Sequence, residues 1–504
     1  MSDSQTPVDH QGFVNVACLG AILAASAVLC ATVARNGVHW DQETALFPWL
    51  IHNGWVLYRD LRDQHSPLFP GLLSLLPDPG SAGTQLVVTV VLVGVVTLSV
   101  AVVAWRIAGP IAALLSVLLY SLWLVPFEGE HLWYDLALAP FYLAAILIGL
   151  RFWRSQASDR QTVTLGLVIG CAMLVKQPAL LVLIGGLPLI AVDAAGHRLR
   201  TVLLYLVAGV LPTLVAMLLF YASGSLGDYI YWASTYNLTS PYTLEGASPV
   251  PATEWPSLLA VFAVVPAAVL SMFQLRTKWP SSWPQLLFVG SVLLAATFSI
   301  WPRYARFHLA AALPLLAVLG GMAVWNLASR RPNWRGVGVV PWAGAALLVL
   351  FLLRVTGPQG VRSLRDIWQS PAAPLPYSTT AGPLREWIQA NTPSDQPILV
   401  YDLDSTLYRV VDRLPPRPWS PLYPWILEGD STADQWLAGI EAAKPAIALV
   451  TPEFVAGRHL PLPDGGRSEA FLRANYTAGP HFTVQKYQNS PTQEIVALQL
   501  LGPR

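Results

Sequence analysis

Long apolar runs alternate with short polar turns from the amino terminus to about residue 354. A helix of about twenty apolar residues is long enough to cross the hydrocarbon core of a bilayer. Eleven runs approach this length, at about 13–34, 84–105, 109–127, 133–150, 162–176, 178–195, 201–222, 257–275, 283–300, 307–328 and 337–354. The pattern predicts a polytopic α-helical membrane protein.

Lysine and arginine are distributed unequally over the turns between these runs, and in membrane proteins they collect on the cytoplasmic side. One set of alternate turns contains Arg106, Arg151, Arg154, Arg160, Arg198, Arg200, Arg276, Lys278, Arg330, Arg331 and Arg335. The other set contains fewer: Arg35, Arg59, Arg62, Lys176, Arg303 and Arg306. This bias predicts a cytoplasmic amino terminus, and the odd number of spans then places the carboxyl terminus outside. Because residues 1–12 contain no lysine or arginine, the first run is interpreted as a retained anchor and not as a cleaved signal peptide.

The composition changes after Arg354, where proline, glycine, serine and aspartate become frequent and no later run is long enough to span. Residues 1–354 are therefore predicted to form a transmembrane domain, and residues 355–504 a separate extracytoplasmic α/β domain. The apolar spacing within the second domain predicts helices at 384–390 and 435–443 and strands at 397–401 and 446–450.

The composition agrees with a bilayer location. Hydrophobic residues make up 54% of the chain and charged residues 12%, against about 25% charged residues in soluble domains. A formal net charge of +1 gives no support for a nucleic-acid partner. Cys18, Cys30 and Cys171 all lie in apolar runs, so the predicted external parts contain no thiol for a disulfide framework.

The longest predicted loop between spans, at 35–83, is too rich in charged and aromatic residues for a simple connector. It contains His39-Trp40-Asp41-Gln42-Glu43 and, further on, Tyr58-Arg59-Asp60 and Asp63-Gln64-His65. We expect it to form amphipathic helices on the bilayer surface, with a polar face toward a cavity. A carboxylate there can take the proton of an acceptor hydroxyl. Alternatively, the two acids near residue 42 only begin a helix, because acidic residues favour first turns.

A second acidic cluster, Glu128-Gly129-Glu130-His131 with Asp135 close behind, follows the third predicted span on the same external face. Ionisable groups at the edge of a membrane are costly unless they pair or face water. We therefore expect this cluster to lie near the first loop and to share its site. The alternative is solvation at the membrane interface.

Cations are also predicted on the external side, which usually avoids positive charge. Lys176-Gln177 ends the fifth predicted span, and Arg303 and Arg306 lie beside Trp301 between the ninth and tenth. Arginine binds phosphate through two parallel hydrogen bonds and lysine as a point charge, so these residues are candidates for holding a lipid phosphate. The alternative is snorkelling toward lipid headgroups.

Three other patterns carry less information. Asp402-Leu403-Asp404 follows a predicted strand, as the metal-binding motif of nucleotide-sugar transferases does, but aspartates there are ordinary turn residues. Asn237-Leu238-Thr239 and Asn475-Tyr476-Thr477 fit the N-glycosylation pattern, which matters only in a host that modifies such sites. The sequence contains no Gly-rich phosphate loop and no zinc ligand pattern.

The motifs of the first loop resemble those of the GT-C glycosyltransferases that use polyprenyl-phosphate sugars, in particular protein O-mannosyltransferases and lipid A aminoarabinose transferases. Acidic residues follow the first span, in Trp40-Asp41-Gln42-Glu43. Gly54-Trp55-Val56-Leu57-Tyr58-Arg59-Asp60 and Asp63-Gln64-His65-Ser66-Pro67-Leu68-Phe69 are similar to the family's Gly, Tyr-Arg-Asp and basic-Pro-Pro-Leu pattern. The resemblance covers residues 35–220 by motif and the remainder by architecture.

The resemblance implies that Asp41 or Glu43 is the catalytic base and that Glu128 and Glu130 support the site. It also implies that Lys176-Gln177 contributes to the donor-phosphate region. Tyr58, Arg59, Asp60, His65, Arg303 and Arg306 are the further candidates for substrate binding. Gln42 separates two acids that are adjacent in the family, which leaves open which of them is the base. Some family members use a divalent metal, and no ligand set in this sequence requires one.

These observations predict a membrane glycosyltransferase of the bacterial inner membrane. It would move a sugar from a polyprenyl-phosphate donor to an extracytoplasmic glycolipid, glycan or protein by inverting displacement. The main alternative is a multi-span transporter or lipid flippase, although transporters commonly have repeated halves and ionisable residues at the midplane. A further alternative is a scaffold without enzymatic activity whose external domain binds a partner.

Overall fold

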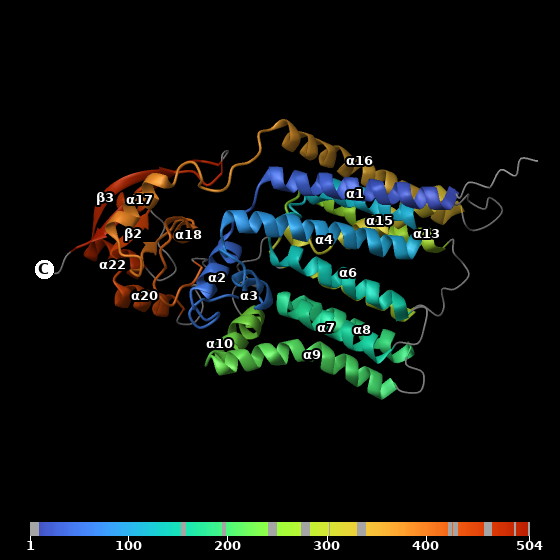
Figure 1. The fold of residues 1–504 in the computed structure, drawn as a ribbon, viewed down its shortest axis with the longest axis horizontal. Helices are drawn as coiled ribbons and strands as arrows, with labels where there is room; N and C mark the ends of the chain where they lie inside the picture. The colour runs from blue at the N-terminus through green and yellow to red at the C-terminus, as the bar shows by residue number, and fades with distance from the viewer. Residues whose placement is uncertain are drawn as a thin grey trace, which may run out of the picture.

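The computed structural model describes residues 10–152, 158–193, 198–239, 249–273, 283–301, 303–329, 339–421, 426, 432–457, 466–487 and 490–501. A bundle of long apolar helices occupies one end of the molecule, and a smaller α/β unit occupies the other (Figure 1). The predicted cytoplasmic residues Arg154, Arg276, Lys278, Arg330, Arg331 and Arg335 lie outside the described residues.

Each predicted span overlaps an observed helix. The bundle consists of α1 (His10–Asn36), α4 (Ala82–Ala108), α5 (Pro110–Leu124), α6 (Tyr134–Phe152), α7 (Asp159–Val175), α8 (Leu180–Asp193), α9 (Arg198–Ala222), α12 (Trp255–Phe262), α13 (Val264–Phe273), α14 (Trp283–Phe298), α15 (Leu313–Ser329) and α16 (Val339–Gln369). Within the described residues, 5 helices are long and apolar enough to cross a membrane, and further apolar helices are shorter. The polytopic helical class is confirmed, while the number of spans stays a prediction.

The smaller unit begins after α16, which continues past the predicted boundary at Arg354 to Gln369. It contains α17 (Gly382–Asn391), β1 (Leu399–Val400), α18 (Leu407–Val411), α20 (Thr432–Ala443), β2 (Ile447–Val450), α21 (Pro452–Val455), α22 (Arg467–Asn475), β3 (Tyr476–Val484) and β4 (Gln493–Leu500). The sheet order is β1-β2-β4-β3. The first pair is parallel, with Leu399 opposite Ala448, and the other pairs are antiparallel. Two helices and two strands of this α/β unit coincide with the predicted ones.

The first loop between bundle helices folds as α2 (Gln42–His52) and α3 (Leu68–Ser74), and α2 is not the predicted helix on the bilayer surface. Its residues from Glu43 to Leu50 are all buried. A helix that is apolar all round is stable only when it is covered on every side. Here the cover comes from the bundle and from the C-terminal unit, whose Trp419 ring lies 5.9 Å from that of Phe47 (ring centroids).

Backbone hydrogen bonds join the same loop to the C-terminal unit. The Trp419 N–H donates to the Asp60 carbonyl at 2.9 Å, and the Arg62 N–H donates to the Trp419 carbonyl at 3.3 Å. The Arg62 guanidinium donates to the Thr432 carbonyl at 3.0 Å. The loop and the C-terminal unit therefore share one hydrophobic core, which includes Leu46, Leu61 and Tyr408.

Gly80 allows α2 to reach its buried position, and this gives the first prediction. A Cβ atom at Gly80 would lie 1.9 Å from the Ala45 carbonyl oxygen, whereas at Gly54 nothing lies within 4 Å, and both residues have a positive φ. We expect Gly80→Ala to destabilise the protein by about 1–3 kcal/mol more than Gly54→Ala, because only the first variant adds a steric clash to the backbone strain. Thermal unfolding of the two purified variants in detergent measures the difference, and equal melting temperatures would contradict the tight fit of α2.

Candidate active site

Asp41 is the residue that precedes α2, and its side chain turns away from that helix. Its backbone is extended, and the side chain makes no capping hydrogen bond to the helix. Instead it accepts a hydrogen bond from Nε2 of His131, which belongs to the loop between α5 and α6. The Asp41 side chain is 35% exposed and that of His131 only 8%. One side of the carboxylate is therefore fixed by the imidazole while the group remains open to a ligand.

The surroundings of Asp41 favour its ionised form. Burial by itself raises its pKa, but the hydrogen bond and charge of His131, together with Lys486, lower the pKa below its usual value. The His39 ring stacks on the His131 ring at 4.7 Å. Burial and the neighbouring His131 lower the pKa of His39 to about 4, so His39 is neutral at physiological pH. Asp41 is therefore a carboxylate that can accept a proton.

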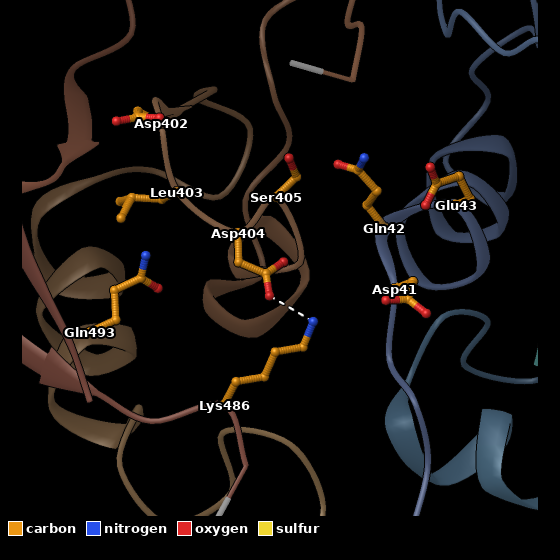
Figure 2. Close-up of a pocket in the computed structure, with 9 residues that line it drawn as sticks. All are labelled: Asp41, Gln42, Glu43, Asp402, Leu403, Asp404, Ser405, Lys486 and Gln493. Carbon is orange, nitrogen blue, oxygen red and sulfur yellow. Dashed lines mark ion pairs between the residues drawn. The ribbon is translucent and has the colours of Figure 1, made fainter. Parts of the chain in front are cut away.

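Asp41 lines an open pocket of about 370 Å³ between the first loop and the C-terminal unit. Figure 2 shows Gln42 and Glu43 beside Asp41 on one wall, and residues of the C-terminal unit on the opposite wall. The lining residues are Asp41, Gln42, Glu43, Asp402, Leu403, Asp404, Ser405, Lys486 and Gln493. Glu43 is 5% exposed, so Asp41 is the more accessible of the two predicted bases.

The Asp402-Leu403-Asp404 segment forms part of this pocket wall. Lys486 Nζ lies 2.7 Å from Asp404 Oδ2, and the Tyr377 hydroxyl donates to the same oxygen at 3.1 Å. The backbone N–H and the hydroxyl of Thr406 both donate to Asp404 Oδ1. Asp404 therefore anchors the loop after β1. The described residues contain no group of three or more His, Cys, Asp or Glu side chains arranged to hold a metal ion.

A second polar centre lies within the bundle. Lys176 Nζ donates to both carboxylate oxygens of Asp135, at 2.9 and 2.8 Å. His308 Nδ1 lies 2.9 Å from Asp135 Oδ2. Asp135 is fully buried and Lys176 is 9% exposed. The Lys176 cation is therefore paired with a carboxylate, and its predicted role in holding a lipid phosphate stays a prediction.

Aromatic rings connect the two centres. The Phe307 ring lies 4.4 Å from that of His131 and 4.5 Å from that of His308 (ring centroids). Trp133 packs against His131 at 5.8 Å and against His65 at 5.6 Å. The predicted convergence of the first loop, the Glu128–Asp135 segment and the Lys176 region is therefore present in the structure.

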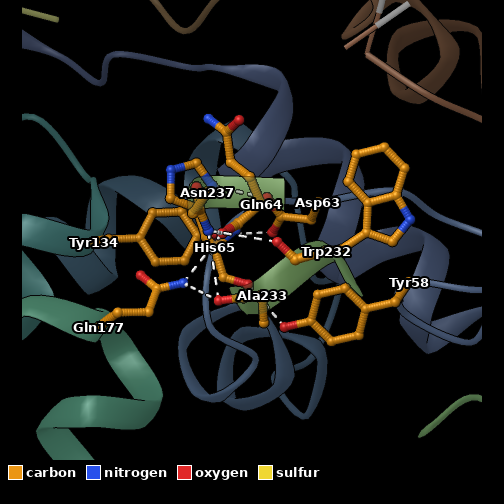
Figure 3. Close-up of polar contacts among 9 residues, drawn as sticks. All are labelled: Tyr58, Asp63, Gln64, His65, Tyr134, Gln177, Trp232, Ala233 and Asn237. Carbon is orange, nitrogen blue, oxygen red and sulfur yellow. Dashed lines mark hydrogen bonds and ion pairs between the residues drawn. The ribbon is translucent and has the colours of Figure 1, made fainter. Parts of the chain in front are cut away.

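Gln177 and His65 hold the second half of the first loop against the bundle (Figure 3). The Gln177 and Asn237 side chains both donate to the Gln64 carbonyl, at 3.2 and 2.7 Å. His65 Nδ1 lies 2.7 Å from Asp63 Oδ1, and its ring stacks on Tyr134 at 4.1 Å. His65 and Gln177 are thus committed to internal contacts.

The Tyr58-Arg59-Asp60 motif does not line the pocket. The Tyr58 side chain is fully buried, and its hydroxyl donates to the His65 carbonyl at 2.8 Å. Arg59 pairs with Asp60 at 3.0 Å and also donates to the Ser223 carbonyl. These three residues join the loop to the end of α9 and to the C-terminal unit, and their substrate-binding role stays a prediction.

Glu130 is buried next to His131 in the chain. The Asn36 side chain donates to its Oε1 at 3.0 Å. Burial raises the pKa of Glu130 to about 8, so this carboxyl is protonated at neutral pH and is not a second base. Glu128 adopts a positive φ of 51° and is half-buried at the turn that leads to Glu130 and His131.

Arg303 and Arg306 lie on the segment between α14 and α15. Arg306 Nε donates to Glu254 Oε1 at 3.1 Å, and its Nη1 donates to the Pro126 carbonyl at 3.4 Å. Arg306 is therefore paired with a carboxylate. Arg303 is half-buried three residues before Arg306.

The sequence did not assign roles to three of the residues that define the site: His131, His308 and Lys486. His131 was noted only as part of the acidic cluster, and its contact with Asp41 joins residues 90 positions apart. Lys486 lies in a polar turn after β3, and no local pattern marks it. The two glycosylation-type asparagines make internal hydrogen bonds, Asn237 to the Gln64 carbonyl and Asn475 to the Phe471 carbonyl.

Comparison with known proteins gives a family-model match over part of the chain and a similar fold over nearly all of it. Residues 64–221 match the family model described as dolichyl-phosphate-mannose-protein mannosyltransferase. Among curated proteins, none matches the chain. The structure of ArnT from Cupriavidus metallidurans bound to undecaprenyl phosphate is similar, with 13% identity, a TM-score of 0.57, and coverage of 98% of this chain and 100% of that one. Apo ArnT gives 15% identity, a TM-score of 0.58, and coverage of 96% and 99%.

The archaeal oligosaccharyltransferase AglB from Archaeoglobus fulgidus, in complex with an inhibitory peptide and a dolichol-phosphate, is also similar. It has 13% identity and a TM-score of 0.51, and the match covers 95% of this chain and 75% of that one. At such low identity the structural likeness establishes the fold. The predicted resemblance and fold class are confirmed: the chain has the GT-C architecture of membrane glycosyltransferases, with a C-terminal domain after the helix bundle.

The buried ion pair between Asp135 and Lys176 gives the second prediction. Removing one partner leaves an uncompensated buried charge, which costs about 3–5 kcal/mol, while removing both restores neutrality. We expect Asp135→Asn and Lys176→Met each to lower the melting temperature in detergent strongly, and the double variant to melt above either single variant. Additive losses in this double-mutant cycle would show that the two side chains do not stabilise each other.

Proposed function

We propose that this chain is a membrane glycosyltransferase that transfers a sugar from a polyprenyl-phosphate donor to an acceptor hydroxyl, with Asp41 as the general base. The observation that carries the proposal is the position of Asp41. It is ionised, hydrogen-bonded to His131 and partly exposed on the wall of a pocket. The family match and the GT-C fold support the reaction class.

In the proposed step, Asp41 accepts the proton of the acceptor hydroxyl as its oxygen attacks the anomeric carbon. A carbon–oxygen bond forms on one side of that carbon, and the bond to the phosphate oxygen breaks on the other. The electron pair of the broken bond leaves with the lipid phosphate, and the configuration at the anomeric carbon inverts. A well-placed base contributes about 10²–10⁴-fold to such a reaction.

Buried polar atoms near the two centres support a donor site in this region. Within the described residues, Gln64 Oε1, His131 Nδ1, Trp133 Nε1 and Tyr142 Oη are buried and have no hydrogen-bond partner. Buried polar groups normally have partners, so a set of such atoms indicates an absent water or ligand. We assign this region to the sugar and phosphate of the donor.

The leaving phosphate requires positive charge that is fixed in advance. We assign this role to Arg303, on the segment that also carries His308 to the Asp135 carboxylate. Lys176 contributes less directly to stabilising the leaving phosphate, because its ammonium is bound to both oxygens of Asp135. Undecaprenyl phosphate and dolichol-phosphate, which are bound in the structures of ArnT and AglB, are the donor carriers that we propose to test.

The base assignment gives the third prediction. We expect Asp41→Asn to lower transfer by about 10²–10⁴-fold, because the amide cannot accept the proton, while Glu43→Gln retains most of the activity. Transfer is measured in membrane vesicles from radiolabelled undecaprenyl-phosphate sugars, beginning with mannose, into glycolipid, glycan and protein fractions. Asp412→Asn, an exposed aspartate away from the pocket, is the matched control.

Three other outcomes have distinct meanings in this assay. Loss of transfer with Glu43→Gln alone would move the base to Glu43. Full transfer with both variants would remove the base from this pocket. Absence of transfer from every lipid-phosphate sugar, combined with unchanged glycans in a deletion strain, would favour the transporter or flippase.

We also propose that the C-terminal unit lies outside the cytoplasm, and this gives the fourth prediction. In a chain whose Cys18, Cys30 and Cys171 are replaced by alanine, we expect Asn391→Cys to react with a membrane-impermeant maleimide in intact cells. Arg160→Cys, an exposed residue in a predicted cytoplasmic turn, should react only after the membrane is permeabilised. The reverse pattern would invert the topology.

A further inference from the structure

Two consecutive residues of the turn after β3, Lys486 and Tyr487, reach the segment that carries the base. The Tyr487 hydroxyl accepts a hydrogen bond from the backbone N–H of Trp40 at 2.8 Å, and Trp40 immediately precedes Asp41 in the chain. Figure 2 shows Lys486 extending from the C-terminal unit toward the pocket wall that holds Asp41. The C-terminal unit therefore approaches the base segment through both residues.

The contact with Tyr487 fixes the backbone of Trp40. The Trp40 indole donates to the Gly80 carbonyl at 2.8 Å, and its ring lies 6.2 Å from that of Tyr377 in the C-terminal unit (ring centroids). Because Trp40 is buried, its backbone N–H depends on an acceptor from the protein. The Tyr487 hydroxyl supplies that acceptor, and so it restrains the backbone from which the Asp41 side chain projects.

The charge of Lys486 acts on Asp41 as well as on its ion-pair partner. The Lys486 side chain is 21% exposed, and its ammonium lies 2.7 Å from Asp404 Oδ2. A partly buried charge is screened less by water than an exposed one. Burial raises the pKa of Asp41, whereas His131 and Lys486 lower it. Lys486 is therefore held by Asp404 and favours the ionised form of Asp41.

The turn that carries both residues is itself restrained. The Gln485 N–H donates to the Thr380 hydroxyl at 2.8 Å, and that hydroxyl donates to the Gln485 carbonyl at 3.2 Å. The Tyr377 N–H donates to the Lys486 carbonyl at 2.9 Å. A charge on such a support is in place before a substrate arrives, as electrostatic preorganisation requires.

We propose that Lys486 and Tyr487 are positioning residues for the base, Tyr487 by fixing the backbone next to Asp41 and Lys486 by holding a positive charge near its carboxylate. Neither residue contacts the reacting atoms in this assignment. The C-terminal unit is then required for the chemical step itself. The inference rests on the proposed function, but the effect of Lys486 on Asp41 can be measured without any transfer reaction.

Asp41 has other titratable neighbours, and the substitutions that test the role of Lys486 leave all of them in place. They come from the base segment and α2, from the loop between α5 and α6, and from the C-terminal unit: His39, Glu43, His131, Asp402 and Tyr487. The ionisation of Asp41 in each variant is therefore compared against the same background.

Two substitutions that should act in opposite directions give the fifth prediction. Lys486→Met removes the cation and should raise the pKa of Asp41. Asp404→Asn removes a negative charge and releases Lys486 from its partner, so it should lower the pKa of Asp41, while asparagine can still accept the two hydrogen bonds of Thr406. Infrared difference spectroscopy of the full-length protein in nanodiscs measures both changes, and the band of protonated Asp41 is identified by its absence from Asp41→Asn.

Two further variants serve as controls for the charge of Lys486. Lys444→Met makes the same change at an exposed lysine outside the pocket and should leave the pKa of Asp41 unchanged. Lys486→Arg keeps the positive charge and should restore the wild-type value. An unchanged pKa in Lys486→Met, or shifts in the same direction in Lys486→Met and Asp404→Asn, would overturn the role of Lys486. If Lys486→Met does not fold, Asp404→Asn decides alone, and an unchanged or raised pKa would overturn it.

The same variants should change the pH dependence of transfer. Transfer falls as Asp41 takes up a proton, so its acid limb should move to higher pH in Lys486→Met and to lower pH in Asp404→Asn. A role of Lys486 in folding alone would change the amount of active protein and leave this limb in place.

Tyr487→Phe tests the positioning role of the hydroxyl, because it removes the acceptor of the Trp40 N–H without changing a charge. Hydrogen exchange at the Trp40 amide, followed by mass spectrometry of the full-length protein, should be about tenfold faster. In the transfer assay kcat should fall about tenfold with KM nearly unchanged. Tyr221→Phe, at an exposed tyrosine of α9, is the matched control. Unchanged exchange, or faster exchange with unchanged kcat, would overturn the role of Tyr487.

The inference and the proposed function fail in different ways. If Asp41→Asn abolishes transfer while the pKa of Asp41 is the same in every variant, the base assignment stands and the role of Lys486 is wrong. If the pKa of Asp41 shifts in opposite directions as expected but no lipid-phosphate sugar supports transfer, the effect of Lys486 on Asp41 stands and the proposed reaction is wrong.

Discussion

The burial of α2 between the helix bundle and the C-terminal unit is the constraint on which the candidate site depends. Residues Glu43 to Leu50 of this helix are all buried, so the helix is stable only when both parts of the molecule cover it. Its beginning is then fixed at the boundary between them. The Trp40 indole donates to the Gly80 carbonyl, and the Trp40 backbone N–H donates to the Tyr487 hydroxyl. Asp41, the next residue, has little freedom in where it lies.

Most of the fold could be predicted from the sequence because bilayer helices follow from local composition. Each predicted apolar run overlaps an observed helix, and the C-terminal helices and strands with buried apolar faces were found by their spacing. Strands β3 and β4 were missed. Most residues of β3 are exposed or half-buried, so the strand lacks the buried alternation that marks a strand in a sequence. The burial of α2 was missed because the residues of the C-terminal unit that cover it lie more than 300 positions later in the sequence.

The candidate site was predictable in its location and less so in its chemistry. The motifs of the first loop and the predicted membrane side of each turn together indicated that Asp41, the Glu130 loop and Lys176 lie in one region. The sequence could not show which charges neutralise each other, because pairing depends on side chains far apart in the chain. Lys176 pairs with Asp135 and Arg306 with Glu254. In a low dielectric an isolated charge is far more costly than a paired one, so a predicted cation in such a protein is better interpreted together with its nearest carboxylate.

This pairing changes how charge is distributed across the proposed reaction centre. The Asp135 centre inside the bundle pairs a carboxylate with a cation, whereas four carboxylates and one cation line the pocket between the first loop and the C-terminal unit. An in-line displacement needs a base on one side of the anomeric carbon and stabilisation of the leaving group on the other. The pocket onto which Asp41 opens faces the C-terminal unit, and the Asp135–Lys176 pair lies within the bundle. In the proposed reaction, an acceptor that enters through the pocket and a donor anchored by its lipid would approach the same carbon from opposite directions, as inversion requires.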